Sequence, residues 1–466
     1  MQDMVPVDGL VVQDAPEHDG TARGNIPNRL ERLPMTGYQR RIFGIIASAW
    51  LVDQVDVALL TFLLGTIVVA FGLTPFQAGL LASMTFAGQL VGNVGAGLAA
   101  DRYGRRTVFQ VTMLVWGLAS FMAAGAWSVG VLMFCRFLIG VGVGGEAPVA
   151  QAMVSELVPA GVRGKYIAIM EGFWAVGYVL SGAITWLLLP YLGWRWVFAV
   201  VGSLSVLVLL VRRGMPESPR WLAERGRLEE ADAVMRHMEA EVERRIGRPL
   251  PPPEPFVAPP HVAHANSLAT VFSREYARRT TMAFGLWFFA LIGFFGLNSW
   301  IAILLRGHGF SIIGSVGFVT LITTGGIPGF IAAAWLLERL GRKPTTALFL
   351  LASAVAAWVY GNSIDQATLF ISGFVMQFFM FGMWSCLYAY TPELYPTRAR
   401  STGAGLASAA GRLGAILGPI VVPVLVRANG QAAAFEVGAA GFVMAAVLVL
   451  ALGVETRGQR LQVVSA

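Results

Sequence analysis

The sequence predicts an all-α membrane protein with twelve transmembrane helices in two six-helix bundles that form a parallel repeat. Of the 466 residues, 56% are hydrophobic and only 13% are charged, whereas a soluble domain carries about 25% charged residues. The hydrophobic residues form twelve long runs, and an α-helix needs roughly 20 such residues to cross a bilayer. Two short motifs also recur at one fixed spacing, which indicates an internal repeat.

The twelve runs divide into two groups of six, with a longer polar stretch between them. The first group is expected at 42–70, 77–99, 107–125, 129–155, 166–189 and 195–211. The second group is expected at 280–304, 312–337, 345–361, 367–391, 403–426 and 433–453. This predicts a disordered cytoplasmic tail at 1–41, an N-terminal bundle at 42–211, a cytoplasmic linker at 212–279, a C-terminal bundle at 280–453 and a second cytoplasmic tail at 454–466.

The basic residues are distributed unevenly between alternate loops. One set of loops holds only Arg195, Arg306 and Arg427, and Arg136 and Arg412 lie within spans, so the other 29 of the 34 Lys and Arg lie in the termini and the remaining loops. The positive-inside rule then places both termini and the linker in the cytoplasm, and we expect the chain in the cell inner membrane. The net charge of +7 follows from this topology. Nucleic acid is therefore not an expected partner.

The repeated motifs relate the two halves. Segment 101–106 (DRYGRR) resembles 338–343 (ERLGRK), and segment 156–159 (ELVP) resembles 393–396 (ELYP), each 237 residues later. Both copies fall on the cytoplasmic side, so the halves share one orientation and are related by an axis along the membrane normal. Parallel halves with a binding site at their interface suit transport by alternating access.

The linker combines a charged segment with a proline-rich one. Residues 220–248 carry Leu228, Ala231, Val234 and Met238 at helical spacing, which predicts an amphipathic helix against the cytoplasmic face. Residues 249–260 are rich in proline, which is typical of an extended linker. We interpret the whole segment as a connector with no direct part in transport.

These loops resemble those of the major facilitator superfamily. The pattern Gly97-x-x-x-Asp101-Arg102-x-Gly104-Arg105-Arg106 matches the loop motif between helices 2 and 3 of that family, and Arg136-x-x-x-Gly140-x-Gly142-x-Gly144-Gly145-x-x-Pro148 is similar to its helix-4 motif. Segments 216–222 (PESPRWL) and 396–401 (PTRARS) resemble motifs of sugar porters and organic-ion transporters. The resemblance covers nearly all of the chain after residue 40 and implies the major facilitator fold.

The resemblance also implies a cytoplasmic gate built from charged loop residues. Such a cluster of charges latches one conformation and is released in the other. The alternative is that the charges only fix the topology. The candidate gate residues are Asp101, Arg102, Arg105, Arg106, Glu156, Arg163, Glu338, Arg342, Glu393 and Arg400.

The sequence lacks the features expected of an enzyme. All five histidines lie outside the spans, and Cys135 and Cys386 lie inside apolar spans, so no metal site, disulfide or cofactor is expected. Gly140, Gly142 and Gly145 satisfy GxGxxG, but a dinucleotide site requires a strand before this pattern. We interpret these glycines as helix-packing positions within the membrane.

Charged side chains inside the spans are candidates for proton coupling, because they are costly to bury in a bilayer. Asp53 and Asp56 lie three residues apart and so share a helix face. Two carboxylates on one face do not both ionise easily unless a cation compensates, and Arg136 is the available cation. By resemblance to proton-coupled sugar porters, Asp56 and Arg136 form the coupling pair; the alternative is a permanent ion pair that specifies packing. Glu146 and Glu171 are further candidates.

The second half supplies the clue to the substrate. Arg412 lies in a span without acidic residues, and guanidinium binds a carboxylate through two hydrogen bonds. Aromatic side chains at similar depth could stack on a flat ligand. The predicted substrate site consists of Arg412, Phe173, Trp174, Phe295, Asn298, Trp300, Trp384 and Tyr388.

Three segments resemble the bacterial niacin transporters, which are related to synaptic vesicle glycoproteins. These segments are 144–150 (GGEAPVA), 171–175 (EGFWA) and 384–393 (WSCLYAYTPE). The resemblance implies proton-coupled uptake of a small aromatic carboxylate such as nicotinate by a monomer. A symporter of sugars or other organic ions, an exporter and a non-transporting membrane sensor remain alternatives. The helix-7 run at 280–304 lacks the paired glutamines of sugar porters.

Overall fold

Long apolar runs form the helices of the computed structural model, which describes residues 25–211, 215–253, 267–396, 399–430 and 432–457. Within those ranges the regular structure is helical, without any strand. The spanning helices of the first half are α2 (Gly37–Phe71), α3 (Pro75–Tyr103), α4 (Arg105–Ala124), α5 (Val129–Leu157) and α6 (Ala160–Val211). Those of the second half are α10 (Ala277–Leu304), α11 (Ile312–Thr323), α12 (Gly326–Leu340), α13 (Arg342–Gly361), α14 (Gln366–Glu393), α15 (Arg400–Asn429) and α16 (Ala432–Leu452).

Ten helical segments of the described chain are long and apolar enough to cross a membrane. One of them, Val162–Leu204, covers the predicted span 166–189 and the first part of 195–211, because α6 runs through both spans and bends between them at Gly193, where φ is +77°. Helix α3 is not among the ten, since glutamine, asparagine and glycine lower its hydropathy, but it packs along α5 and α15 like its neighbours. With α3 added and α6 counted twice, the twelve predicted spans are present, and the all-α membrane fold is confirmed.

The eighth span differs from the single helix predicted at 312–337. The structure divides it into α11 and α12 around Thr324 and Gly325. Pro328 lacks the backbone N–H that would bond to the Thr324 carbonyl, and adjacent glycines weaken the helix further.

The glycines of α5 allow it to pack closely against α3. A Cβ atom on Gly140 would lie 2.1 Å from the carbonyl oxygen of Thr85, and one on Gly144 would lie 2.4 Å from that of Gln89. These distances require glycine at both positions. The helix-packing interpretation of the GxGxxG pattern therefore agrees with the structure.

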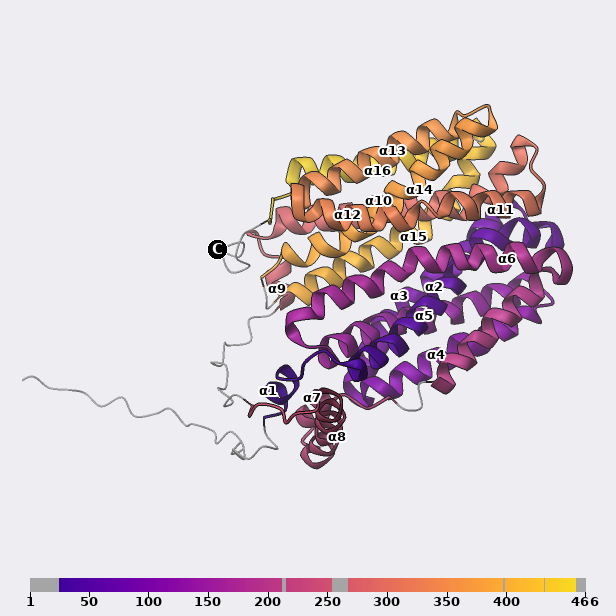
Figure 1. The fold of residues 1–466 in the computed structure, drawn as a ribbon. Coiled ribbons are helices and arrows are strands. Elements are labelled where there is room, and N and C mark those ends of the chain that lie inside the picture. Colours follow the sequence, from indigo (N-terminus) through magenta and orange to yellow (C-terminus); the bar gives the residue numbers. More distant parts are fainter. Residues whose placement is uncertain (1–24, 212–214, 254–266, 397–398, 431, 458–466) are drawn as a thin grey trace, which may run out of the picture.

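The two halves lie side by side, indigo to magenta in one and orange to yellow in the other (Figure 1). They meet through α3 with α15, α2 with α10, and α6 with α11. Ser83 Oγ donates a hydrogen bond of 2.6 Å to the Ile416 carbonyl, and Gly317 packs against Trp186. Ser83 lies in the part of α3 away from the 101–106 motif. The contacts between halves therefore gather at the end of the bundle opposite the motif loops.

The linker contains α7 (Pro219–Glu224), α8 (Leu228–Ile246) and α9 (Ser267–Val271), with α7 and α8 at one end of the bundle (Figure 1). The amphipathic helix predicted in this region is α8, which buries Ala231, Met235, Met238 and Val242. Residues 1–24, 254–266 and 458–466, which include most of the predicted tails and part of the proline-rich segment, lie outside the described residues.

The predicted disordered tail differs from the structure at its C-terminal end. Residues Ile26–Glu31 form α1, and α2 begins at Gly37 rather than 42. The buried guanidinium of Arg29 pairs with Asp232 at 2.6 Å and with Glu239 at 2.7 Å on α8. These partners are about 200 residues away in the sequence, so composition alone does not indicate the helix.

Replacement of Arg29 by alanine is expected to release α1 from α8. Burial raises the pKa of Glu239, but hydrogen bonds from Arg29 and Arg32 outweigh it, and the net pKa is lowered. The ion pairs are therefore fully formed above the ordinary glutamate pKa of 4.5 and are lost as the pH falls below it. Amide exchange of residues 26–31 at pH 7 should accelerate by about tenfold or more in the variant. Arg236→Ala, whose side chain is mostly exposed although it also pairs with Asp232, should leave exchange unchanged; equal rates in both variants would contradict this docking.

Candidate functional site

A fully buried ion pair joins α2 and α5. Arg136 Nη1 lies 2.8 Å from Asp56 Oδ1, and neither residue is exposed. Ser120 Oγ donates to the second oxygen of Asp56 at 2.8 Å, and Arg136 Nε donates to Thr85 Oγ1 at 3.0 Å. The ring of Phe198 faces the guanidinium at 5.9 Å. Both charges are thus hydrogen-bonded inside the first half, so the structure brings the two predicted coupling residues together.

The other three acidic candidates are buried as well. Asp53 lies one helical turn before Asp56, and Glu146 lies on α5; both are fully buried. Glu171 on α6 accepts a hydrogen bond of 2.9 Å from Gln151 Nε2, and its Oε2 has no hydrogen-bond partner among the described residues. Glu171 also interacts electrostatically with Arg412.

Arg412 extends from α15 to the interface between the halves. Its Nη1 donates a hydrogen bond of 2.6 Å to Gln89 Oε1 on α3. The partner is a neutral amide, and the charge of Arg412 acts on Glu171 and Tyr388 without a direct ion pair among the described residues. Arg412 Nε is buried and has no hydrogen-bond partner in the described chain. The guanidinium therefore retains a donor and a charge for a ligand.

A small cavity adjoins Arg412 between the two halves. It has a volume of about 20 Å³, and its walls include Trp50, Gln54, Trp174, Phe295 and Tyr388. That volume holds about one water molecule. The site is therefore closed in this conformation, and a larger ligand requires the halves to separate.

Aromatic rings from both halves meet above this cavity. The rings of Trp174 on α6 and Trp384 on α14 have centroids 3.9 Å apart, and Phe295 lies 6.4 Å from Trp174. Trp384 stacks on Tyr388 at 5.9 Å. The buried Nε1 groups of Trp50 and Trp384 have no hydrogen-bond acceptor in the described chain. Flat apolar walls with unused donors are suited to a flat polar ligand.

Three of the predicted substrate residues lie outside this cluster. Phe173 is half-buried and does not line the cavity. Asn298 donates to the Phe294 carbonyl at 3.0 Å and accepts from Gln377 at 3.1 Å. Trp300 donates to the Pro419 carbonyl at 2.9 Å. The last two side chains connect helices within the second half, so the structure assigns them packing contacts rather than cavity walls.

Several residues that the sequence did not single out belong to the two sites. Gln89, Gln54 and Trp50 line the cavity, Ser120 bonds to Asp56, and Thr85 bonds to Arg136. Gln54, Gln89 and Ser120 could have been found in the sequence, because each is a polar residue inside an apolar span. Trp50 gave no such signal, because tryptophan is common near membrane surfaces.

The charged loop of the first half forms one connected cluster. Arg105 pairs with Asp101 at 2.6 Å and approaches Glu156 at 3.6 Å. Both carboxylate oxygens of Glu217 accept the backbone N–H of Arg106 in the first turn of α4. A carboxylate at that position is favoured by the helix dipole.

The second half contains an equivalent cluster. Arg342 pairs with Glu338 at 3.1 Å and with Glu393 at 3.0 Å. Glu455 accepts the backbone N–H groups of Arg342 and Lys343 at the start of α13, as Glu217 does at α4. The ion pairs of Arg105 and of Arg342 each stay within one half. The sequence repeat is therefore also a structural repeat.

Three further gate candidates lie outside these two clusters of ion pairs. Arg102 lies over the ring of Tyr103 at 5.4 Å. Arg163 Nε makes no hydrogen bond within the described residues, and Arg400 is the first residue of α15. Among the residues that the structure describes, no group of three or more His, Cys, Asp and Glu could hold a metal ion.

Comparison with known proteins supports this architecture. The model of the Major Facilitator Superfamily matches residues 46–361 and 319–465. A niacin transporter, NiaP, of Acinetobacter baylyi is 34% identical over 94% of this chain and 99% of its own length. A putative niacin/nicotinamide transporter of Bacillus subtilis is 32% identical over 91% of this chain and 98% of its own. The fold is similar to a partially occluded inward-open structure of the Escherichia coli xylose transporter XylE, with a TM-score of 0.73, 18% identity and coverage of 91% and 100% of the two chains.

These similarities extend over most of each protein and agree with the helix arrangement. The relatives are named as transporters and not as enzymes. The chain is accordingly a multi-pass membrane transporter, and it belongs to the major facilitator superfamily.

Proposed function

We propose that this chain takes up a small aromatic carboxylate such as nicotinate, together with protons, by alternating access. One observation carries the proposal. The half-buried guanidinium of Arg412 lies between the two halves with Nε unused, next to the aromatic rings of Trp174 and Tyr388. A carboxylate bound there meets a charge-assisted donor, and its ring meets flat apolar walls.

The chemistry of the site favours an acid over a sugar. A sugar presents many hydroxyl groups, and binding them requires several amide and carboxyl side chains. The cavity has two amides, Gln54 and Gln89, and Gln89 is already bonded to Arg412. The names of the two niacin-transporter relatives support the same substrate class.

The proposed orientation places both termini in the cytoplasm of a cell whose inner membrane holds the protein. The contacts between halves then close the side away from the cytoplasm, because they lie opposite the motif loops (Figure 1). Substrate would leave this state toward the cytoplasm.

Proton coupling is assigned to the buried carboxylates, with Asp56 and Arg136 as the principal pair. Protonation of Asp56 would release Arg136 and change the contact between α2 and α5. Glu171 offers a second proton site nearer to the substrate, because its charge and that of Arg412 interact. A permanent ion pair that only stabilises packing is the competing interpretation of Asp56–Arg136.

The gate hypothesis predicts a transport defect when Asp101 becomes asparagine. The carboxylate of Asp101 is 69% exposed, so losing its ion pair with Arg105 should barely affect folding. A shift of about 1 kcal/mol in the balance between conformations should slow transport about fivefold and leave substrate affinity within about twofold. Uptake and binding measured on one preparation provide the test. Glu338→Gln is the matched variant of the second half, and an equal loss of binding and transport in Asp101→Asn would indicate misfolding instead.

A thermal-shift panel tests the substrate class. Nicotinate and benzoate should raise the melting temperature of the purified protein, whereas xylose, glucose and nicotinamide should have little effect. Stabilisation by sugars alone would favour the sugar-symporter alternative. Stabilisation by acids without any uptake in proteoliposomes would favour a sensor.

A further inference from the structure

A second cavity lies at the end of the bundle that carries the linker helices, far from Arg412 in the fold. It is formed by the starts of α2 and α4, the segment before α7, and α8. Its volume is about 530 Å³, many times that of the closed central cavity. None of the proposed substrate or proton-coupling residues lines this cavity, although Arg106 of the predicted gate does.

The lining of this cavity is rich in basic side chains. Four arginines, Arg41, Arg106, Arg244 and Arg245, face a single acid, Glu241. Arg244 donates to both oxygens of Glu241 at 2.7 Å, whereas Arg245 lies 3.8 Å from it. The lining thus holds four arginines and one acidic residue, an excess of basic side chains that favours an anion.

Apolar side chains also line this cavity. They include Ile42 and Ile45 of α2 and the buried Met215, together with Tyr38. A Cβ atom on Gly37 would lie only 2.7 Å from Arg245 Nη1. The end of α8 therefore contacts the first turn of α2. The cavity is thus lined by both charged and apolar side chains.

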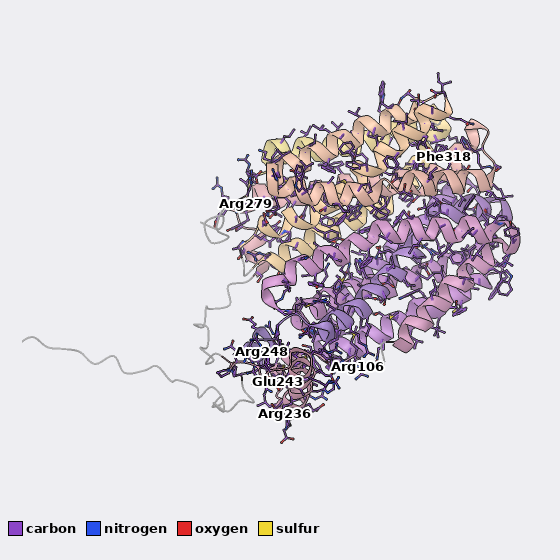
Figure 2. The ribbon with its side chains drawn as sticks, in the orientation of Figure 1. Arg106, Arg236, Glu243, Arg248, Arg279 and Phe318 are labelled. Carbon is purple, nitrogen blue, oxygen red and sulfur yellow. The ribbon has the colours of Figure 1, made fainter. Side chains whose placement is uncertain are left out.

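Its position matches the boundary between lipid headgroups and hydrocarbon. The spanning helices α2 and α4 begin here, at Gly37 and Arg105, and such helix ends with Tyr and Arg lie at the membrane interface. Figure 2 shows Arg106 where the bundle approaches α8. Basic pockets between helices at this depth are suited to the phosphates of anionic lipids.

We propose that this cavity binds the headgroup of an anionic phospholipid, with its phosphate on the arginines and the start of its acyl chains on Ile42, Ile45 and Met215. The bound lipid would connect α8 to the starts of α2 and α4, and so attach the linker to the N-terminal half. Phosphatidylglycerol is a suitable probe, because it is anionic and has a small headgroup.

The test measures binding of dioctanoyl phosphatidylglycerol to the full-length protein in neutral detergent, by thermal shift and by native mass spectrometry. Each arginine near a phosphate contributes about fivefold in affinity. The double variant Arg41→Gln/Arg245→Gln should therefore bind the lipid about 30-fold more weakly. Glu241→Gln should bind it about fivefold more tightly, since Arg244 is freed. Arg248→Gln, an exposed arginine of the same region that does not line the cavity, is the matched control and should bind like the unmodified protein.

Several results would overturn the proposal. Equal lipid affinity in the double variant and the control places the lipid elsewhere. Equal stabilisation by zwitterionic dioctanoyl phosphatidylcholine means that the arginines do not select charge. An equal shift with inorganic phosphate at the same concentration identifies a soluble anion as the ligand instead. Because Glu241→Gln predicts a gain in affinity, a folding defect in the double variant cannot produce the whole pattern.

Discussion

Asp56→Asn is expected to abolish concentrative uptake. The unmodified residue is fully buried, and its carboxylate is held by Arg136 and Ser120. Asparagine keeps the shape but cannot carry a proton on and off, so the proton gradient would no longer drive the cycle. Accumulation above the external concentration should disappear, whereas exchange of substrate across the membrane should continue at a measurable rate.

Stability must be separated from coupling in this variant. Asparagine leaves Arg136 buried without its counter-charge, which costs about 3–5 kcal/mol. The double variant Asp56→Asn/Arg136→Gln removes both charges and should recover much of that stability without recovering accumulation. Ser120→Ala removes one hydrogen bond and should reduce uptake only modestly. If Asp56→Asn still concentrates substrate in response to the gradient, the coupling site is elsewhere, and Glu171 becomes the leading candidate.

Arg412→Ala is expected to weaken binding of nicotinate by about 10- to 150-fold. A charge-assisted hydrogen bond contributes about 1.5–3 kcal/mol, which corresponds to that range. The neutral amide, nicotinamide, has no charge for the guanidinium, so it should bind poorly to the unmodified protein and respond little to the substitution. Arg412→Lys should recover only part of the affinity, because an ammonium lacks the planar fork. Calorimetry with both ligands on all three proteins measures these differences.

The hydrogen bond from Arg412 to Gln89 suggests the competing account. In it, the arginine only ties α15 to α3 and does not contact the ligand. Arg412→Ala would then weaken acid and amide by the same factor and lower the melting temperature. Gln89→Leu is the matched control, because it removes the same interhelical bond and retains the guanidinium. Retained acid affinity in Gln89→Leu, together with its loss in Arg412→Ala, would support direct recognition.

Much of the fold could be predicted because the thickness of the bilayer sets the length that a spanning helix must have. The predicted spans and the 237-residue repeat both reappear in the structure, the repeat as equivalent ion pairs of Arg105 and Arg342. The fold departs from the prediction where contacts between residues far apart in the sequence determine the local structure. Helix α1 forms on the expected tail because Arg29 meets Asp232 and Glu239 of α8, and no local pattern indicates those partners.

The charged residues of the site could be predicted, because a charge buried inside a membrane span is costly and therefore rare. The aromatic residues could not, because the direction of their side chains depends on how each helix is rotated about its axis. A charge inside a span, as at Asp56, Arg136 or Arg412, is conspicuous in any sequence. Which way an aromatic side chain points is not, since phenylalanine and tryptophan also cover lipid-facing and packing surfaces. Trp174 reaches the cavity, whereas its neighbour Phe173 points elsewhere and Trp300 bonds to the Pro419 carbonyl.

Proton-coupled transport can be measured as uptake of labelled nicotinate into proteoliposomes under an imposed inward proton gradient. We expect accumulation above equilibrium that a protonophore collapses, that unlabelled nicotinate competes away, and that Asp56→Asn lacks. Uptake no faster than in protein-free liposomes, or accumulation that does not respond to the proton gradient, would contradict this expectation.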